Sequence, residues 1–453
     1  MLGQSQAKQI TDRVLALGKN GQTEVVLWVT DGALTRFANN IIHQNVAETN
    51  TAVTVRVALG RRLGTASTND MTDAGLARVV ECAAGLARLQ PENPEFPGFP
   101  EPASFTPAHG FDEAVAVVTP KVRAQAVGKI CRQSKEAGAL AAGAFSTDVR
   151  EIAVANSQGV FCYHAATSCD LQAAAMAEGG DNLQGASGSG YGQMSSWKLE
   201  DMMAERVGRE AVQKALRARN PQPIEPEVFT VVLEPYAAQD LLNMLNHVGF
   251  GAQAMQEGRS WMNDRIGQQV LSPSVTIVDN GHDELGFPMP FDFEGVPKQQ
   301  VVLVENGVPR GPVYDSTTAR KEGKVSTGHA LPPPNTYGPM AANLVMSPGT
   351  ATLEEMIRTT ERGLYITRFW YTRVVHPRDC VITGMTRDGT FLIEHGELTT
   401  PVKNLRFTQG YVPALAMVDM IGHEARTLTG GWFGTSRVPA LKLHEFSFTG
   451  ATQ

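Results

Sequence analysis

A long run of alternating apolar and polar residues near the start of the chain most constrains its fold. The stretches TEVVLWVT, at 23–30, and ALTRFANNIIHQNVAETNTAVTVRVALGRRLGTAST, at 33–68, alternate in this way and are rich in β-branched residues. Successive side chains of a strand point to opposite faces, so this alternation indicates half-exposed strands of an antiparallel sheet. The segment 149–178, VREIAVANSQGVFCYHAATSCDLQAAAMAE, predicts two more strands around a turn at Asn156–Gly159.

Helical periodicity separates these strand runs. The N-terminal segment places Ile10, Val14 and Leu17 on one helical face. The segment MTDAGLARVVECAAGLARL, at 71–89, places Leu76, Val79, Val80, Ala83 and Leu86 on one face, with Thr72 or Asp70 as the N-cap. Further helices are predicted over about 120–138 and 199–218, and a proline-rich loop crosses 91–107.

The segment Gly179–Gly192 is the most glycine-rich of the chain. It lacks the Gly-Lys-Ser/Thr sequence of a phosphate-binding loop, and no helix follows it directly. We therefore interpret it as a flexible crossing between two elements.

The proline-rich segment RNPQPIEPE, at 219–227, is the best candidate for a domain boundary in the 453-residue chain. It divides the chain into an N-terminal α/β domain, 1–220, and a β-rich C-terminal domain of antiparallel strands, 221–453. Two hairpins, at Asn306-Gly307 and His395-Gly396, and a capping box between Thr352 and Glu355 are predicted in the second domain. The fold class is α+β.

Charge and cysteine content exclude several classes of protein. The net charge of −7 argues against a nucleic-acid-binding face. No apolar run is long enough to cross a membrane, and the N-terminal segment lacks the features of a signal peptide. The five cysteines are scattered and odd in number, which is typical of reduced core thiols, so we expect a cytoplasmic protein.

Nucleophile and metal motifs are incomplete. The histidines beside acids, His282, His423 and His444, lack a second histidine at metal-binding spacing, so we interpret them as surface or capping residues. Ser187 lacks the second glycine of a nucleophile elbow and is interpreted as a loop serine. Cys162 shares a strand face with His164 but has no evident oxyanion site, which favours core packing.

The stretch LLNMLNHVGFG, Leu241–Gly251, places His247 on a helix just before glycines. From the residues alone, His247 is either one ligand of a metal site or what remains of such a site after its other ligands were lost.

Several stretches together resemble the TldD/PmbA family. They are FANNIIHQNVAETNTAVTVRVALGRRLGTASTND, VANSQGVF, FDFEGVPKQQVVLVENGVPRGPVYDSTTARKEGKVSTGHA, NLVMSPGTATLEEMI, GLYITRFW and FLIEHGELTTPVKNLRF. Their order and spacing match the family from about residue 10 to residue 445. The resemblance implies a cytoplasmic peptidase complex of two paralogous subunits that trims unfolded or modified peptides. Its TldD-type subunit carries zinc on a His-Glu-x-x-x-His helix with a C-terminal cysteine, and its PmbA-type subunit lacks these ligands.

In this resemblance the stretch Leu241–Gly251 corresponds to the metal helix. Leu245 stands at the first histidine, Asn246 at the glutamate and Phe250 at the second histidine, while His247 falls on a position that is not a ligand. The segment GGWFGTSRVPALKLHEFSFTG contains no cysteine, and Cys380 comes too early. Leucine and phenylalanine cannot coordinate an ion, and an asparagine amide is a poor base. We therefore predict a PmbA-type subunit without catalytic residues, metal ligands or cofactor, with zinc on the partner.

Three functions follow as hypotheses. The first is a non-catalytic partner of a TldD-type zinc subunit that helps to hold extended peptides. The residues that the resemblance places near the chamber are His247, Gly249, Gly251, Ser326, Thr327, Gly328 and His329. The second is a stand-alone peptide-binding or structural homodimer. The third, ranked last, is a hydrolase that uses Cys162 or a pairing of His247 with His329.

Overall fold

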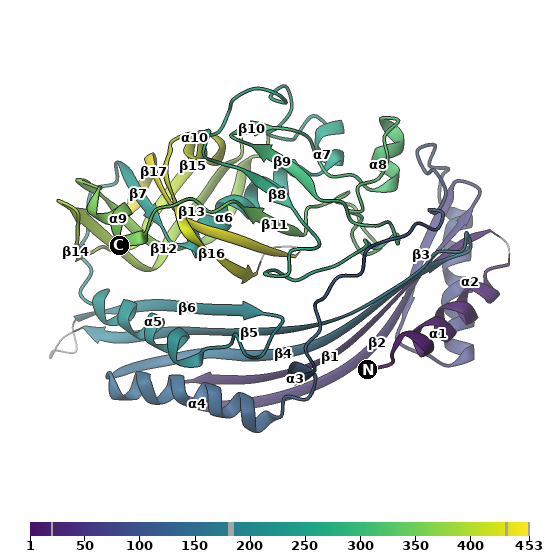
Figure 1. Ribbon diagram of the computed structural model, residues 1–453, viewed down its shortest axis with the longest axis horizontal. Helices are drawn as coiled ribbons and strands as arrows, with labels where there is room; N and C mark the ends of the chain where they lie inside the picture. The colour runs from purple at the N-terminus through teal and green to yellow at the C-terminus, as the bar shows by residue number, and fades with distance from the viewer. Residues whose placement is uncertain (20, 180–184, 431–433, 452–453) are drawn as a thin grey trace.

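Two β-sheets, one from each half of the chain, organise the molecule (Figure 1). The computed structural model describes residues 1–19, 21–179, 185–430 and 434–451. Figure 1 shows the N-terminal sheet as a curved layer below the C-terminal half. The predicted α+β class, with an antiparallel N-terminal sheet, is confirmed.

The N-terminal sheet has the strand order β3-β2-β1-β4-β5-β6, and all its neighbours are antiparallel. Its strands are β1 (Gln22–Ala38), β2 (Ile41–Leu59), β3 (Arg62–Thr68), β4 (Ala139–Asn156), β5 (Phe161–Gly179) and β6 (Gly185–Ser196). The apolar members of the alternating runs, such as Val25, Val53 and Val55, lie in the core.

Helices cover the face of this sheet that is turned away from the C-terminal half (Figure 1). They are α1 (Gln4–Leu17), α2 (Asp73–Leu89), α4 (Pro120–Glu136) and α5 (Ala204–Arg217), and the short α3 spans Glu113–Ala116. Thr72 caps α2, as predicted, by accepting a hydrogen bond from Gly75 N. Leu17 and Leu86, predicted to share a helix face with residues that are buried or partly buried, are themselves exposed.

The glycine-rich segment is not the flexible crossing that the sequence suggested. Its described part, from Gly185, is edge strand β6, hydrogen-bonded to β5, and residues 180–184 lie outside the described part of the chain. Alternate glycines on one face of β6 let the backbone of α5 approach closely. A Cβ atom at Gly190 would overlap Ala211 O and Ala215 N. Close packing of helix on strand, and not backbone freedom, explains the glycines here.

The C-terminal sheet closes on itself. Strands β7 (Val228–Leu233), β12 (Arg362–His376), β13 (Val381–Glu394), β15 (Leu405–Gly410) and β17 (Thr435–Ala451) pair in a ring, because β17 also pairs with β7. The expectation of purely antiparallel strands is wrong for β7–β12 and β11–β17, which are parallel. More than a hundred residues separate β7 from β12, enough chain for the crossover that parallel strands require.

The remaining C-terminal elements extend or cover this ring. They are α6 (Pro235–Leu245), a π turn (Asn246–Phe250), α7 (Ala252–Gln256), β8 (Ile277–Asp279), β9 (Val301–Glu305), β10 (Val308–Pro309), α8 (Ser316–Lys321), β11 (Asn343–Met346), α9 (Leu353–Arg358), β14 (Glu397–Pro401), α10 (Tyr411–Ala416) and β16 (Val418–Thr429). Both predicted hairpin turns are present, with positive φ at Asn306, Gly307, His395 and Gly396. The capping box of Thr352 and Glu355 starts α9 as predicted.

The two halves meet along the open face of the N-terminal sheet. Trp28 stacks on Phe293, with ring centroids 5.4 Å apart, and the proline-rich loop contributes Phe105 against Phe291 at 5.2 Å. Among the described residues, no helix is both long enough and apolar enough to cross a membrane.

Candidate functional site

Helix α6 and the π turn that ends it form the centre of the C-terminal half. Pro235 occupies the first helical turn, where its missing N–H costs nothing. Leu241, Leu242 and Leu245 are fully buried in the core of this half. A π turn widens the helix by one residue and is frequent at functional sites, so the stretch singled out by the sequence has an unusual backbone here.

The two positions that the resemblance assigns to ligand histidines, and the one that it assigns to the helix glutamate, are packed as core. Leu245 and Phe250 are 0% exposed. The Asn246 amide donates from Nδ2 to Ala341 O at 2.8 Å, and its Oδ1 is buried without a hydrogen-bond partner in the described part of the chain. All three side chains are thus fixed inside the protein.

Trp261 fills the space beside the π turn. Its indole nitrogen donates to Leu245 O at 3.0 Å, and its ring packs edge-on against Phe250 at a centroid distance of 5.7 Å. A Cβ atom at Gly249 would overlap the same indole ring, so this glycine is needed for close packing. Ser260 Oγ donates to Gly249 O at 2.8 Å.

These residues do not fit a zinc ion. Leu245 and Phe250 have hydrocarbon side chains without a donor atom for a metal. Asn246 has a neutral amide whose NH₂ group already donates a hydrogen bond to Ala341 O. Across residues 1–19, 21–179, 185–430 and 434–451, no group of three or more His, Cys, Asp or Glu side chains is arranged to hold a metal. Residues 431–433, within the C-terminal segment that lacks the family cysteine, lie outside the described residues.

His247 lies at the surface end of this core. Its ring is partly buried and tilted against Tyr337, with centroids 6.4 Å apart. Burial, assisted by the charge of Arg259, lowers the pKa of His247 below its usual value, so the neutral imidazole is favoured. His247 and His329, paired in the last-ranked hypothesis, sit in separate hydrogen-bonding environments.

The segment Ser326–His329 forms an internal hydrogen-bonded loop. Ser326 Oγ donates to Tyr314 O at 3.2 Å, and Thr327 Oγ1 lies 2.9 Å from His329 Nδ1. His329 Nε2 lies 2.9 Å from Asp279 Oδ1, and both side chains are fully buried. Burial lowers the pKa of His329 against the opposing effect of Asp279, while Lys298 and His329 hold the pKa of Asp279 below its usual value despite its burial.

The predicted chamber residues are neighbours, but most of them face inward. Gly251 forms an isolated β-bridge with Val313. Tyr314, which follows Val313, is hydrogen-bonded to Ser326 and Thr327, so the segment Val313–Tyr314 joins the π turn to this loop. Ser326 and His329 are buried, as are the two glycines, whereas His247 and Thr327 are partly exposed. In this conformation the buried members hold the loop together, and a peptide contact stays a prediction for His247 and Thr327.

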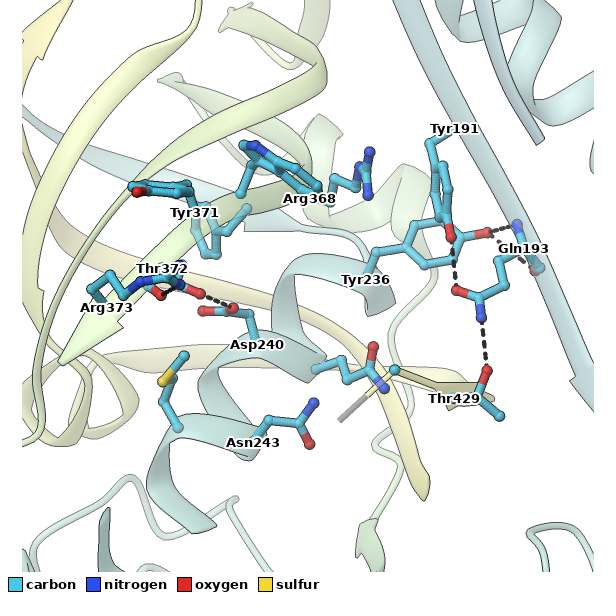
Figure 2. A pocket seen from close by; sticks show the side chains of 15 residues that line it. Tyr191, Gln193, Tyr236, Asp240, Asn243, Arg368, Tyr371, Thr372, Arg373 and Thr429 are labelled. Carbon is cyan, nitrogen blue, oxygen red and sulfur yellow. Dashed lines mark hydrogen bonds between the residues drawn. The ribbon is translucent and has the colours of Figure 1, made fainter. Parts of the chain in front are cut away.

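A pocket of about 380 Å³ opens on the other side of α6, between the two sheets (Figure 2). We call it the inter-sheet pocket. It is bounded by β6, α6, the bulged half of β12 and the end of β16. Its lining residues are Tyr191, Gln193, Tyr236, Gln239, Asp240, Asn243, Met244, Arg368, Phe369, Trp370, Tyr371, Thr372, Arg373, Thr429 and Gly430.

Aromatic rings and guanidinium groups dominate one wall of the inter-sheet pocket. Arg368 lies over Tyr191, 4.2 Å from the ring centroid, and is neutralised by Asp388. Trp370 and Tyr371 are exposed, and Tyr371 adopts a positive φ where β12 bulges against β13. Arg373 is exposed and lies 4.5 Å from the Tyr371 ring centroid. This wall can contact apolar and anionic groups together.

The opposite wall carries amides and one perturbed acid. Asp240 accepts hydrogen bonds from Tyr411 Oη at 2.7 Å and Thr372 Oγ1 at 2.8 Å. Burial raises the pKa of Asp240 to about 6, against the lowering effect of these two hydrogen bonds. Asn243 and Gln239 extend the wall with groups that donate and accept.

A partly buried charge network joins the two sheets at the edge of the inter-sheet pocket. Glu210 of α5 pairs with Lys214 at 2.8 Å and with Arg426 of β16 at 2.9 Å, and Lys214 also reaches Glu234 at 2.6 Å. Burial raises the pKa of Glu210, but the charges of Lys214 and Arg426 outweigh it and lower the pKa overall. The Tyr236 hydroxyl accepts a hydrogen bond from Gln193 N. This bond uses the main-chain N–H of Gln193 on the free edge of β6.

Sequence reasoning did not find the inter-sheet pocket. The nearest signal was the run RFWYTR, Arg368–Arg373, in which aromatic and basic residues follow one another on a predicted strand. Its pocket partners come from β6, α6 and β16, and only the tertiary fold brings these together.

The other candidates for chemistry are separate from both sites. Cys162 is buried, and burial together with Asp292 raises its thiol pKa to about 12, which favours the neutral thiol over the nucleophilic thiolate. His164 is bonded to Pro288 O at 3.0 Å. His282 is partly buried. His423 and His444 are exposed, and their rings are bonded to Ala351 O and to Thr230 Oγ1, each at 3.0 Å. Ser187, interpreted as a loop serine, lies on strand β6 and is exposed.

Comparison with known proteins gives the same family along most of the chain. Models of the PmbA/TldA metallopeptidases match as domain 1 over 24–87, as the central domain over 119–219 and as the C-terminal domain over 226–450. A "Metalloprotease PmbA" of Escherichia coli O157:H7 is 23% identical over 95% of this chain and 93% of its own length. A "Metalloprotease TldD homolog" of Haemophilus influenzae is 24% identical over 91% and 89%.

Solved structures share the fold. The crystal structure of TldE from Thermococcus kodakarensis superposes with a TM-score of 0.90 at 20% identity, over 97% of this chain and all of that one. A structure from Thermotoga maritima, described as a putative modulator of a DNA gyrase, superposes with a TM-score of 0.86 at 19% identity, over 98% of this chain and all of that one. Overall identity does not separate the two subunit types, because the PmbA and TldD relatives are equally distant.

Proposed function

Because the chain belongs to the PmbA/TldD metallopeptidase family, we propose that it is the PmbA-type subunit, without zinc, of a cytoplasmic peptidase complex. A separate TldD-type chain carries the zinc ion and the catalytic groups. The complex acts in the proteolysis or maturation of unfolded or modified peptides, and this subunit holds the extended peptide.

The packing of α6 and its π turn is the observation that carries this proposal. Leu245, Asn246 and Phe250 are core residues, with Trp261 filling the space beside them. A zinc-binding version of this helix needs imidazole and carboxylate groups around an open coordination position. Neither the residue types nor the packed space supports such a site.

The inter-sheet pocket supplies groups suited to an extended peptide. The amides of Gln239 and Asn243 can pair with a peptide main chain, Trp370 and Tyr371 can cover apolar side chains, and Arg373 can pair with a carboxylate. We therefore assign peptide holding to this pocket, alongside His247 and Thr327.

The test is co-expression with a family member from the same organism that has an intact His-Glu-x-x-x-His helix. We expect this chain alone to bind no zinc by elemental analysis and to cleave no peptide. The two chains should co-purify and cleave an unstructured peptide together, and replacing the partner's helix glutamate by glutamine should abolish cleavage. Stoichiometric zinc on this chain alone would refute the proposal. So would a partner that cleaves equally well by itself and forms no complex.

Peptide holding is tested separately with Trp370→Ala in the assembled complex. We expect KM for the peptide to rise several-fold with kcat little changed, because removing an aromatic contact costs about 1–2 kcal/mol of binding. Arg378→Ala is the matched control, since Arg378 lies near the tip of the same hairpin, pairs with Asp264 and does not line the pocket. Equal effects of both variants would contradict the assignment.

A stand-alone peptide-binding or structural homodimer is the alternative function. This alternative predicts that the chain binds peptides without any partner, and that adding another family member does not change the peptide affinity. Peptide binding measured by fluorescence anisotropy, with and without the zinc-bearing chain, separates the two proposals.

A further inference from the structure

A second pocket lies where the two halves meet, on the open face of the N-terminal sheet. It has a volume of about 360 Å³. Strands β1, β4 and β5 line it from the sheet, and the loop between β8 and β9, the segment before β11, the end of β16 and the start of β17 line it from the C-terminal half. We call it the junction pocket. Its volume is within the range of about 300–1,000 Å³ that is typical of ligand sites.

Apolar side chains form most of the wall of the junction pocket. Trp28 and Ile152 are cross-strand partners on the sheet, and Trp28 stacks on Phe293 of the other half with ring centroids 5.4 Å apart. Met289 and Leu331 extend this surface. Because burial of apolar surface drives association, the wall suits an apolar group.

Most polar side chains of this wall already have hydrogen-bond partners within the protein. Trp28 Nε1 and Thr167 Oγ1 donate hydrogen bonds of 3.0 and 2.8 Å to other residues. Both ends of the Asn343 amide are bonded. His164 Nε2 lies 3.0 Å from a main-chain oxygen, and burial outweighs this bond and lowers the pKa of His164, so the neutral imidazole is favoured. These groups have little left to offer to the peptide groups of a ligand.

Arg150 is the exception, and among the described lining residues it is the only one with a permanently charged side chain. It lies in the middle of the sheet, paired with Thr30 of β1 and Ala166 of β5. Its side chain is exposed, and no carboxylate of the described residues lies within 4 Å of it. Asp148, on the same face of β4, interacts with it at longer range. The guanidinium is therefore available to an anion.

The junction pocket adjoins the inter-sheet pocket. Thr429, at the end of β16, lines both pockets. Its hydroxyl donates to Asp170 of β5, which also accepts from Gln193 of β6, so these side chains hold the end of β16 against the sheet where the pockets meet. Figure 1 shows β16 above β5 and β6. A peptide in the inter-sheet pocket can therefore place one of its ends in the junction pocket.

We propose that the junction pocket binds the C-terminal residue of an extended peptide, with an apolar side chain against the wall of Trp28, Met289 and Leu331 and the free carboxylate on Arg150. This inference rests on the proposed function, in which the chain holds an extended peptide, and it adds which end of the peptide is recognised.

The chemistry of the wall favours a C-terminal residue over other parts of a peptide. A free N-terminus is a cation, and the described lining residues offer it a guanidinium and no carboxylate. An internal residue brings two peptide groups that need partners, and burying unpaired peptide groups is costly. A C-terminal residue brings one peptide group and an anion that pairs with Arg150 by charge-assisted hydrogen bonds.

The first test measures, by fluorescence anisotropy, the affinity of the isolated full chain for two unstructured peptides. Both carry a fluorophore at the N-terminus and the same sequence ending in leucine, and they differ only in a free or an amidated C-terminus. We expect the free acid to bind roughly 5- to 10-fold more tightly, a value between those of an exposed ion pair and of a charge-assisted hydrogen bond. Equal affinities would overturn the inference.

Three variants locate the group that recognises the carboxylate. Arg150→Gln should remove the preference for the free acid. Arg36→Gln is the matched control and should keep the preference, because Arg36 is exposed on the same face of the same sheet and does not line the pocket. Arg373→Gln changes an exposed guanidinium of the inter-sheet pocket and should keep it as well. A preference that survives Arg150→Gln, or that is lost in either of the other variants, would contradict the assignment.

The second test concerns the apolar wall. Two free-acid peptides of equal composition end in Ser-Leu or in Leu-Ser. The first should bind the wild-type chain roughly 5- to 10-fold more tightly, because only the last side chain enters the junction pocket and a buried leucine gains more than a serine. Equal binding of the two peptides would count against the inference.

Failure of this inference and failure of the proposed function give different results. If acid and amide bind alike while the two chains still form a complex that cleaves the peptide, the inference is wrong and the proposed function stands. If the preference depends on Arg150 but no complex forms with a zinc-bearing chain, the junction pocket stands and the proposed function is wrong.

Discussion

Restoring the family's metal ligands in this chain should unfold it and not create a zinc site. The change is Leu245→His, Asn246→Glu and Phe250→His together. Two fully buried apolar side chains would be lost, each worth about 1.5–3 kcal/mol. Each buried polar replacement without a partner costs about 1–3 kcal/mol more, and the new carboxylate would meet Ala341 O, which accepts and cannot donate.

The summed cost is roughly 6–15 kcal/mol, against a total stability of about 5–15 kcal/mol for an ordinary domain. The assay is urea unfolding followed by tryptophan fluorescence, with zinc measured by elemental analysis of the folded fraction. Gln253→His, on the partly exposed face of α7, serves as the control and should change stability by less than about 0.5 kcal/mol. A triple variant with near wild-type stability and one zinc ion per chain would refute the packing argument.

Further predictions concern the sheets and their junction. Gly190→Val should lower the free energy of unfolding, measured in urea, by about 2–4 kcal/mol, because the valine side chain would displace α5. The control is Gly128→Ala, which should be neutral or slightly stabilising because a Cβ atom at residue 128 contacts no other group. Arg426→Met leaves Glu210 with less compensation inside the junction and should cost about 1.5–3 kcal/mol, against less than 1 kcal/mol for Arg259→Met in an exposed pair; equal losses would contradict a network shielded from solvent. The pKa of Asp240 is raised to about 6 in the folded state, so its stabilising effect is present below about pH 4 and lost as the pH rises through 6. Asp240→Asn should therefore stabilise the protein by up to roughly 3 kcal/mol at pH 8 and by little at pH 4, and a gain independent of pH would show that this carboxyl is not the cause.

Local sequence signals predicted many of the elements because short-range physics sets them. Thr72 caps α2, Thr352 and Glu355 close the box at α9, and Asn306-Gly307 makes the turn between β9 and β10. Each depends on residues within about four positions of one another. The α9 helix is short and ends at Arg358, and β12 begins four residues later at Arg362.

The glycine-rich segment shows where this approach failed. Gly188 and Gly190 suggest mobility when read locally, yet they lie in a strand because α5 packs directly on them. No local rule distinguishes a glycine needed for backbone freedom from one needed for close approach, since the helix that comes close lies further along the chain.

The sequence by itself determined the family, the α+β class and the identity of the residues at the metal positions. Those properties depend on which residues occur in which order, and Leu245 and Phe250 cannot coordinate a metal, nor Asn246 act as a base, wherever they are placed. The tertiary structure decided that Trp261 packs beside these positions and that β12, α6 and β6 enclose a pocket. Each of these results from contacts between segments far apart in the chain, and burial and pairing over such distances follow from the whole fold and not from any local pattern.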